Sequence, residues 1–233
     1  MIVIRSKDFD QELNLDSNKF YSLVIENVSF YRTFYIGLKN QIENGDDYLL
    51  YEDTNDKKGS IDKDCYLIEN PLNVQIDEKK INLVVQKSIG TKQPPEMRES
   101  YQVLLSKINE FINSISYDYY LPLIFDDGLT LVNFLKAINL RIADTTDTTD
   151  NPVDQLVFKI RELSYVLGFK VFFIMNLYDY FTPREIESIH KELNSLEIKM
   201  INISSHKNKY KINNEFIVYI DEDLAEIHIG EDD

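Results

Sequence analysis

The chain has 233 residues, 43% of them hydrophobic, which is enough for one large domain or two small domains with a packed core. Its 25 Lys and Arg against 40 Asp and Glu give a net charge of −15, which argues against nucleic acid as a partner unless the basic side chains gather on one surface. Because no stretch reaches the roughly 20 apolar residues of a membrane helix and the one cysteine, Cys65, cannot form an internal disulfide, we expect a cytoplasmic protein with no membrane partner.

The first 88 residues alternate between strand and helix patterns. Short apolar runs predict four strands, at Ile2–Arg5, Ser22–Glu26, Tyr48–Tyr51 and Cys65–Glu69. Helices are predicted over Phe30–Ile42 and Asp77–Lys87, with Asp77 as the N-cap of the second helix. Cys65 begins an apolar run, which favours a buried structural thiol over a nucleophile.

The junction between the second strand and the first helix is where a nucleotide-binding fold would carry its phosphate loop. Such a loop needs glycines, so that backbone N–H groups can surround the phosphates, and a Lys to meet their charge. Residues 23–33 contain no Gly and no Lys followed by Ser or Thr, and Glu26 would repel a phosphate. We therefore do not expect ATP to bind at this junction.

Residues 89–167 have a different character. Gly90 and the pair Pro94–Pro95 mark a boundary, and apolar residues then recur at steps of three and four over 101–115, 129–138 and 153–167. Each stretch predicts an amphipathic helix, which needs a partner surface for its apolar face. We interpret these helices as an inserted arm, because the strand–helix alternation returns after residue 168.

The segment after Gly168 gives the clearest pattern of the chain. Val171–Met175 is an unbroken apolar run, typical of a strand buried on both faces, and Asn176 follows it where a nucleotidase would place a magnesium-binding Asp. Residues 182–185 (Thr-Pro-Arg-Glu) predict a helix start with a capping box. Further elements are predicted at Pro183–Leu196, Ile198–Ile203, Phe216–Ile220 and Ala225–Ile229.

The predicted fold class is α/β. Residues 1–88 and 168–233 would form a degenerate nucleotide-binding, P-loop ATPase-like head, and residues 89–167 an inserted α-helical arm. The three histidines show no spacing typical of a catalytic triad or a zinc site, so the residues themselves favour a protein that is not an enzyme.

Carboxylates cluster before the second predicted arm helix. Asp126 and Asp127 precede Gly128, and Asp118 lies eight residues before Asp126. Oxygen ligands of this kind suit calcium, which takes about six to eight of them. The alternative is a solvated loop followed by a helix N-cap, because carboxylates are favoured at that end of the helix dipole.

Basic residues of the predicted arm form the second candidate set. They either form a surface for phosphate groups or lie on solvated helix faces, which is the usual place for charged residues. The set comprises Lys92, Arg98, Lys107, Lys136, Arg141, Lys159 and Arg161.

Over residues 118–203 the chain resembles the accessory protein of type II-A CRISPR adaptation, a family whose subunits assemble into a ring that holds DNA. The resemblance rests on the order and spacing of several pieces. They are the acidic junction Phe125–Gly128, the helix end Leu135–Ile142, the helix Val153–Leu167, the strand Val171–Asn176 and the helix start Tyr180–Glu185. The strand Val24–Glu26 and the turn Asn70–Pro71 match more loosely.

The resemblance implies an ATPase-like fold without ATPase activity and a tetrameric ring that binds duplex DNA ends through a positively lined hole. It also implies stabilisation by calcium, and action beside the CRISPR integrase complex and the RNA-guided nuclease during spacer acquisition. Asn133 and Pro122 stand where relatives carry acidic residues, so the implied calcium ligands would be incomplete. For the DNA the resemblance assigns Lys136 and Arg141, then Lys159 and Arg161, and for calcium it assigns Asp126 and Asp127. From the pattern of charged residues we add Lys107 to the DNA-binding set and Asp118 to the calcium ligands.

We therefore predict a non-enzymatic, sequence-independent binder of double-stranded DNA ends that acts as a homotetramer. Four copies would bring their weakly basic arms together into one positive channel. Two alternatives stay open, a scaffold that meets acidic protein surfaces with its Lys207–Lys211 loop and a divergent nucleotidase.

Overall fold

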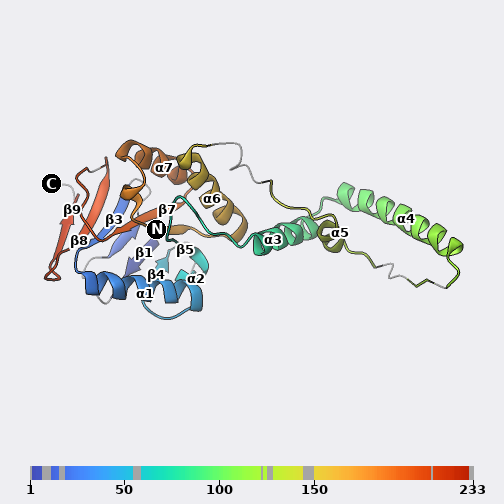
Figure 1. The fold of residues 1–233 in the computed structure, drawn as a ribbon, viewed down its shortest axis with the longest axis horizontal. Coiled ribbons are helices and arrows are strands. Elements are labelled where there is room, and N and C mark those ends of the chain that lie inside the picture. Colours follow the sequence, from blue (N-terminus) through green and yellow to red (C-terminus); the bar gives the residue numbers. More distant parts are fainter. Residues whose placement is uncertain are drawn as a thin grey trace. The chain divides into compact units, whose positions relative to one another are not determined.

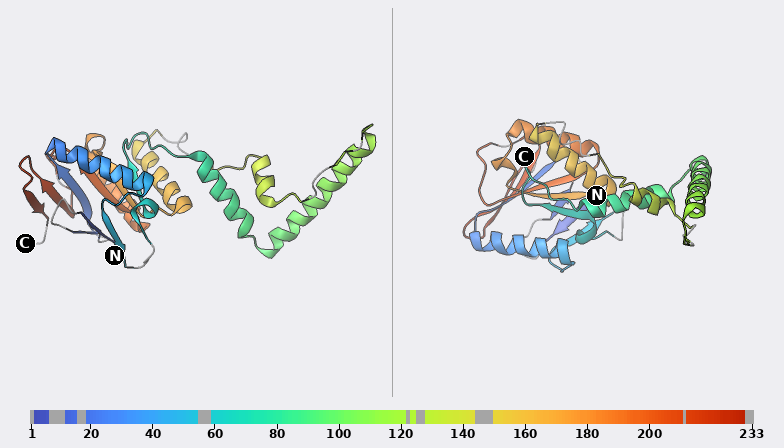
Figure 2. Two further views of the ribbon diagram at one scale, coloured as in Figure 1. Left: turned by 90° about the horizontal axis from the view of Figure 1, so that it is seen from below. Right: turned by 45° about the vertical axis from the view of Figure 1, so that its right-hand side comes forward.

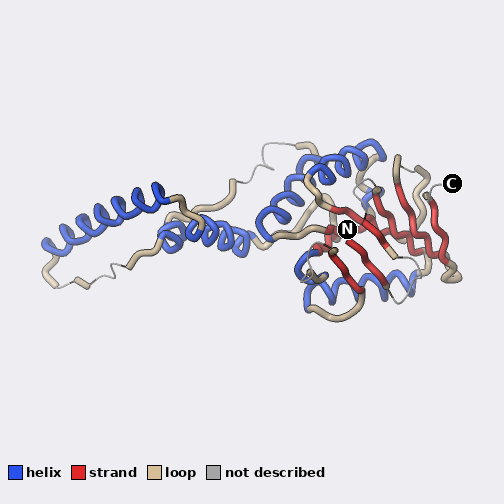
Figure 3. Tube along the Cα trace, turned by 180° about the vertical axis from the view of Figure 1, so that it is seen from behind, coloured by secondary structure: helices blue, strands red, loops and turns tan. Residues whose placement is uncertain are grey.

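The computed structural model describes residues 2–6, 12–15, 19–54, 59–121, 123–124, 128–143, 150–210 and 212–230. The chain divides into two compact units. Unit 1 comprises Met1–Ile76 and Thr145–Asp233, and unit 2 comprises Asp77–Asp144. Every described strand belongs to unit 1, whereas the regular elements described in unit 2 are helices (Figures 1 and 3).

A six-stranded sheet forms the centre of unit 1, in the order β5-β6-β7-β3-β8-β9. The first five strands are parallel and β9 is antiparallel to β8. All residues of β3 and β6 are buried, as expected for parallel strands covered on both faces. The strands are β3 (Phe20–Ile25), β5 (Cys65–Ile68), β6 (Val171–Met175), β7 (Lys199–Ser204), β8 (Glu215–Ile220) and β9 (Glu226–Ile229).

Helices and a second sheet cover the two faces of this sheet (Figure 2). Helix α1 (Val28–Asn44) lies on one face, where Phe34 and Leu38 join a core cluster with side chains of β3, β6, β7 and β8. The same cluster includes the small antiparallel sheet β2-β1-β4 and the short helix α2 (Ile61–Asp64). Helices α6 (Pro152–Leu167) and α7 (Pro183–Ser195) lie on the other face. The small sheet is formed by β1 (Ile2–Arg5), β2 (Leu13–Leu15) and β4 (Leu50–Asp53).

Polar side chains fix the helix starts as the sequence predicted. Asp77 accepts a hydrogen bond from the Lys80 backbone N–H at 3.0 Å, which confirms its role as the N-cap of helix α3 (Glu78–Thr91). At the start of α7, Thr182 and Glu185 form the predicted capping box, in which the Thr182 backbone N–H donates to the Glu185 carboxylate at 2.8 Å. That bond lowers the pKa of Glu185.

Unit 2 contains α3 (Glu78–Thr91), α4 (Pro95–Asp118) and α5 (Leu131–Ala137). Helices α3 and α5 pack against each other, and Ile81 of α3 and Leu135 of α5 are buried. Gly90 makes this approach feasible, because a Cβ atom there would lie 2.4 Å from a methyl carbon of Val132. The side chain of Gln86 donates to the Leu140 carbonyl at 2.8 Å and so ties α3 to the segment after α5.

The α/β class predicted from the sequence is confirmed, but several details differ. Strand β4 begins two residues later than expected, at Leu50, and the sequence did not predict β2, α2 or the short 3-10 helix η2 (Leu177–Asp179). The unit boundaries also differ from the expected 89–167 arm: α3 lies in unit 2, and α6 lies in unit 1 because it packs against α7. Among the described residues, no helix is both long enough and apolar enough to cross a lipid bilayer.

Candidate functional site

The turn between β3 and α1 lies at the carboxyl edge of the sheet, where nucleotide-binding folds hold phosphate. Only Glu26 and Asn27 separate the two elements. The Asn27 side chain accepts from the Phe30 backbone N–H at 2.9 Å, and the Glu26 N–H donates to the Ile220 carbonyl at 2.8 Å. A phosphate loop of the Walker type needs about eight residues with free N–H groups. This turn is too short to enclose a phosphate, and its protein partners already occupy these N–H groups.

Carboxylates surround the same edge. A hydrogen bond with Glu26 is the main cause that raises the pKa of Tyr219 to about 12, and the negative charges of Asp221 and Glu222 act in the same direction. Asp179, which follows β6, lies 3.1 Å from Nε2 of His206. The carboxylates of Glu26, Asp221 and Glu222 make the part of the edge beside the β3–α1 turn negative.

Asn176 ends β6 in the left-handed region, with φ 52° and ψ 41°. Burial raises the pKa of the neighbouring Tyr31, and a hydrogen bond with the Asn176 side chain opposes this effect. The next backbone N–H, of Leu177, donates to the fully buried Asn202 side chain at 2.9 Å. Within the part of the chain that is described, no three His, Cys, Asp or Glu side chains gather closely enough to hold a metal ion. At the position where a nucleotidase would carry a magnesium-binding Asp, this chain therefore has the amide side chain of Asn176.

Three of the residues predicted to bind DNA lie in unit 2. Lys107 is on α4, Lys136 is on α5 and Arg141 follows α5. All three are exposed, and none has an ion-pair partner among the residues that the structure describes.

The other two predicted DNA-binding residues lie in unit 1, on α6. The Lys159 ammonium is 3.6 Å from the Glu162 carboxylate, and the Arg161 guanidinium is 3.4 Å from that of Glu192. These two cations already have anionic neighbours, and the expected set is divided between the two units. The predicted arm, residues 89–167, included α6, whereas the structure assigns α6 to unit 1, where it packs on α7.

The net charge is distributed unequally between the units. Unit 2 carries eight Lys and Arg against nine Asp and Glu, a net charge of −1. Unit 1 carries 17 against 31, a net charge of −14. The strong acidity that argued against nucleic acid therefore belongs almost entirely to unit 1.

The predicted calcium ligands fall at the limits of the described chain. Asp126 and Asp127 lie outside the described residues. Asp118 is the last residue of α4, and its side chain is not described. Calcium binding at this junction stays a prediction.

Helix α4 exposes most of its apolar face. None of its described side chains is buried, and Phe111 is 65% exposed. The Tyr101 ring lies 6.0 Å from that of Phe134 within unit 2. Apolar residues recur along the helix at alternating steps of four and three, the spacing of a seam between paired helices: Met97, Tyr101, Leu104, Ile108, Phe111 and Ile115.

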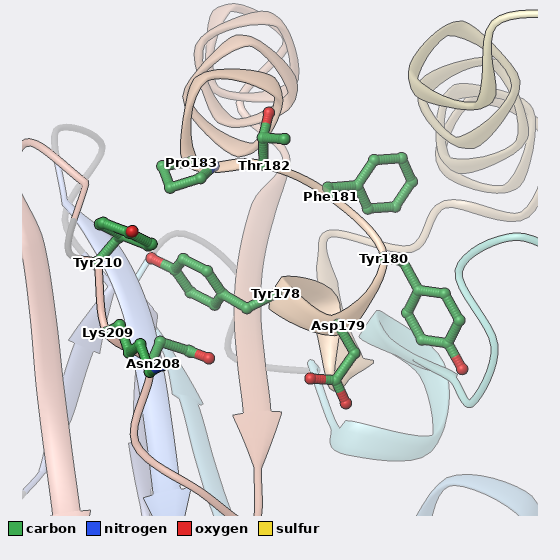
Figure 4. Close-up of a pocket in the computed structure, with 9 residues that line it drawn as sticks. All are labelled: Tyr178, Asp179, Tyr180, Phe181, Thr182, Pro183, Asn208, Lys209 and Tyr210. Carbon is green, nitrogen blue, oxygen red and sulfur yellow. The ribbon is translucent and has the colours of Figure 1, made fainter.

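A pocket of about 400 Å³ lies beyond the carboxyl ends of β6 and β7 (Figure 4). Residues 178–183 form one side and residues 208–210 the other. The sequence did not predict it, because the two segments are far apart in the chain and become neighbours only through the parallel pairing of β6 with β7. The sequence signal for this pocket was weak: aromatic residues stand close to chain turns, at Tyr178, Tyr180 and Tyr210.

Comparison with known families decides what kind of protein this is. The family model for CRISPR-associated protein (Cas_Csn2) matches residues 41–224, well over half of the chain. The chain belongs to this family. No protein with a curated description matches it.

One solved structure similar to this Cas_Csn2 family member is the dimeric structure of a post-hydrolysis state of the ATP-binding cassette MJ0796 bound to ADP and Pi. The two chains are 13% identical over 99% of this chain and 98% of that chain, with a TM-score of 0.42. A likeness at that level carries no argument about function.

Membership of the Cas_Csn2 family confirms the resemblance noted in the sequence. The protein is CRISPR-associated, which is consistent with a role in adaptation. The matched residues include the unit 2 cations, helix α4 and the pocket, whereas the β3–α1 turn lies before them.

Proposed function

We propose that this protein binds double-stranded DNA ends without sequence preference, as a homotetrameric ring, during CRISPR spacer acquisition. The observation that carries the proposal is the charge distribution. Unit 2 is almost neutral and exposes cations without described ion-pair partners, in a chain whose other unit has a net charge of −14. A duplex that meets unit 2 therefore finds attractive groups, whereas the net charge of unit 1 as a whole disfavours binding there.

The contacts would be made to phosphates. Lys107, Lys136 and Arg141 present positive charges but no fixed pattern of donors and acceptors of the kind that reads base edges. One copy offers few cations, so several copies must combine them to hold a duplex. Affinity should fall with salt at a slope of about −0.9 for each phosphate neutralised.

Self-association is supported by α4. A 24-residue helix with an apolar seam and no buried side chain among those described needs a partner surface. A second copy supplies the same seam, which favours pairing between identical helices. We propose that such pairing contributes to the tetramer and that calcium, held by Asp118, Asp126 and Asp127, stabilises it.

We further propose that the protein is not an enzyme and acts beside the CRISPR integrase complex and the RNA-guided nuclease in the cytoplasm. The two-residue β3–α1 turn and the carboxylates around it support the absence of ATP hydrolysis. Robust ATP turnover by the unmodified protein, lost on Glu26→Ala or Asn176→Ala, would favour the nucleotidase alternative instead.

Lys136→Glu tests the proposal on DNA. It should weaken binding to a linear duplex at least about tenfold and reduce the salt slope by about one for each copy engaged, because one phosphate contact per copy is lost. Lys63→Glu is the matched control, since Lys63 is an exposed Lys of unit 1 and the charge change is the same.

Gel shifts and sedimentation of both variants would be compared with those of the unmodified protein. We expect the assembly to be unchanged in both variants and the affinity to fall only for Lys136→Glu. An equal affinity for linear and closed-circular duplex would contradict loading at ends, and a loss of assembly in Lys136→Glu would mean that the residue is structural.

A further inference from the structure

We propose that the pocket between residues 178–183 and 208–210 is a docking site for a short acidic segment of a partner protein, anchored by a proline or aromatic ring. This site lies in unit 1 and is separate from the DNA-binding residues of the proposed function. The inference rests on the walls of the pocket, on the rigidity of one wall and on the charge at its rim.

The walls offer ring surfaces on two sides. In Figure 4 the Tyr178 side chain points across the pocket toward Tyr210, with Thr182 and Pro183 above them, while Tyr180 and Phe181 turn away. Tyr210 is 70% exposed, which is a large aromatic surface left in water. Grooves lined by aromatic side chains and a proline bind extended, proline-containing peptides, because such peptides lose little conformational entropy.

The Tyr178 wall is held rigidly from behind. Its hydroxyl donates to the Glu215 carboxylate at 2.8 Å, and its ring meets the Phe20 ring edge-on at a centroid distance of 6.5 Å. Glu215 is itself only 3% exposed and also accepts from the Ser22 hydroxyl at 2.6 Å. A wall fixed in this way needs no reordering when a ligand binds, and this lowers the cost of binding.

The rim is positive in an otherwise acidic unit. Residues 198–214 contain no Asp or Glu, and within them Lys209 lines the pocket. Neither Lys209 nor Arg184, which follows the lining residue Pro183 in the sequence, has an ion-pair partner in the described ranges. The only carboxylate of the lining, Asp179, already faces His206 at 3.1 Å. These charges complement an acidic ligand.

The size of the pocket favours a peptide over single-stranded nucleic acid. Nucleic acid of this kind is bound along a basic groove that follows about four or more nucleotides. Here a single cavity of about 400 Å³ offers one lining lysine, and the carboxylates of Glu26, Asp221 and Glu222 lie at the same edge of the sheet. A peptide needs only one ring in the cavity and one or two carboxylates at the rim of the cavity. The side chain of Asn208, which has both donors and an acceptor, can form hydrogen bonds with the peptide backbone.

The test uses a fluorescein-labelled decapeptide of alternating glutamate and proline with one central tyrosine, followed by fluorescence anisotropy on the full chain. A peptide with lysine in place of glutamate and a labelled ten-residue oligothymidine serve as comparison probes. The pocket variants are Tyr210→Ala and Lys209→Glu. The control variants are Tyr165→Ala, which removes a ring that is 93% exposed on α6, and Lys191→Glu, which changes an exposed Lys of α7 outside the pocket.

We expect the acidic peptide to bind saturably and at least about tenfold more tightly than the lysine peptide, as charge complementarity requires. Tyr210→Ala and Lys209→Glu should each weaken binding of the acidic peptide about tenfold, a loss typical of an anchoring aromatic or charged residue. The control variants should bind this peptide as tightly as the unmodified protein does. Affinity for a linear duplex should be the same in all four variants, so that a failure of the DNA proposal appears separately, in Lys136→Glu.

Three results would overturn the inference. They are the absence of saturable binding of the acidic peptide, an equal loss in the pocket and control variants, and tighter binding of oligothymidine that the two pocket variants weaken. The last result would assign the pocket to nucleic acid. Because Tyr210 and Lys209 are exposed, both variants should melt at the temperature of the unmodified protein, and Lys209→Glu alone can decide the outcome if Tyr210→Ala does not.

Discussion

Glu215 is the side chain whose removal should destabilise unit 1 most informatively. It begins β8, is only 3% exposed, and its carboxylate accepts hydrogen bonds from three donors in the described part of the chain. The donors are the Ser22 hydroxyl at 2.6 Å, the Tyr178 hydroxyl at 2.8 Å and the Ile212 backbone N–H at 3.2 Å. Burial, assisted by the nearby negative charge of Glu215, raises the pKa of Tyr178, so this phenol stays protonated and remains a donor.

The cost of Glu215→Ala follows from these three donors. A buried donor left without an acceptor costs about 1–3 kcal/mol, and hydrogen bonds to a charged group lie at the upper end. The shorter side chain leaves a cavity, and water in that cavity can serve as acceptor for one of the three donors. With two donors left without an acceptor, we expect a loss of about 3–5 kcal/mol in the free energy of unfolding. Glu215→Gln keeps the volume and one acceptor oxygen, so its loss should be smaller, about 1–2 kcal/mol.

Urea denaturation measures both losses as shifts of the transition midpoint at constant slope. Glu222→Ala is the control, because it removes an exposed carboxylate just after the same strand and should change stability by less than about 0.5 kcal/mol. A loss below about 1 kcal/mol for Glu215→Ala would refute the reasoning, since the three donors would then have other partners. Glu215→Ala should also weaken binding of the acidic peptide, because the Tyr178 side chain loses the hydrogen bond that holds it in place.

Two further predictions concern pH and assembly. Burial lowers the pKa of His190, so the unfolded chain binds its proton first, near pH 6.5, and stability should fall as the pH drops through that value. The difference between the urea midpoints at pH 8 and pH 5.5 should be smaller in His190→Phe than in the unmodified protein. An equal difference in the two proteins would contradict this. Phe111→Glu places a charge on the exposed seam of α4 and should lower the mass seen by light scattering, with and without calcium, whereas Glu110→Gln on the same helix should not.

Patterns confined to one segment predicted structure well, and contacts between distant segments limited the rest. The apolar run of β6 and the capping box at Thr182 and Glu185 are local, so their positions are readable from the sequence. Strand β2 and helix α2 have only three and four residues, too few to show a period. Helix α6 shows the same amphipathic stripe whichever unit it packs on, and only its contacts with α7 settle the matter.

The candidate sites depended on a different kind of information. The types and spacing of Lys107, Lys136 and Arg141 were visible in the sequence, but the sequence could not show that these cations lack described partners while Lys159 and Arg161 have them. The pocket needed two segments, residues 178–183 and 208–210, that the pairing of β6 with β7 brings together. Glu215, which is buried behind the pocket, cannot be distinguished in the sequence from an exposed acidic residue.

Net charge is therefore a poor guide to the partners of this protein. Charges act over about 10 Å at 0.1 M salt, so a ligand responds to the side chains near it and not to the sum over the chain. The net charge of −14 on unit 1 includes a 17-residue stretch without any carboxylate, and the net charge of −1 on unit 2 includes eight cations. The two partners proposed here, a duplex and an acidic peptide, are both polyanions, and each would bind a different surface of this acidic chain through the cations of that surface. Measurements near 0.1 M salt report these local contacts. Lys136→Glu should weaken binding of the duplex alone, and Lys209→Glu should weaken binding of the acidic peptide alone.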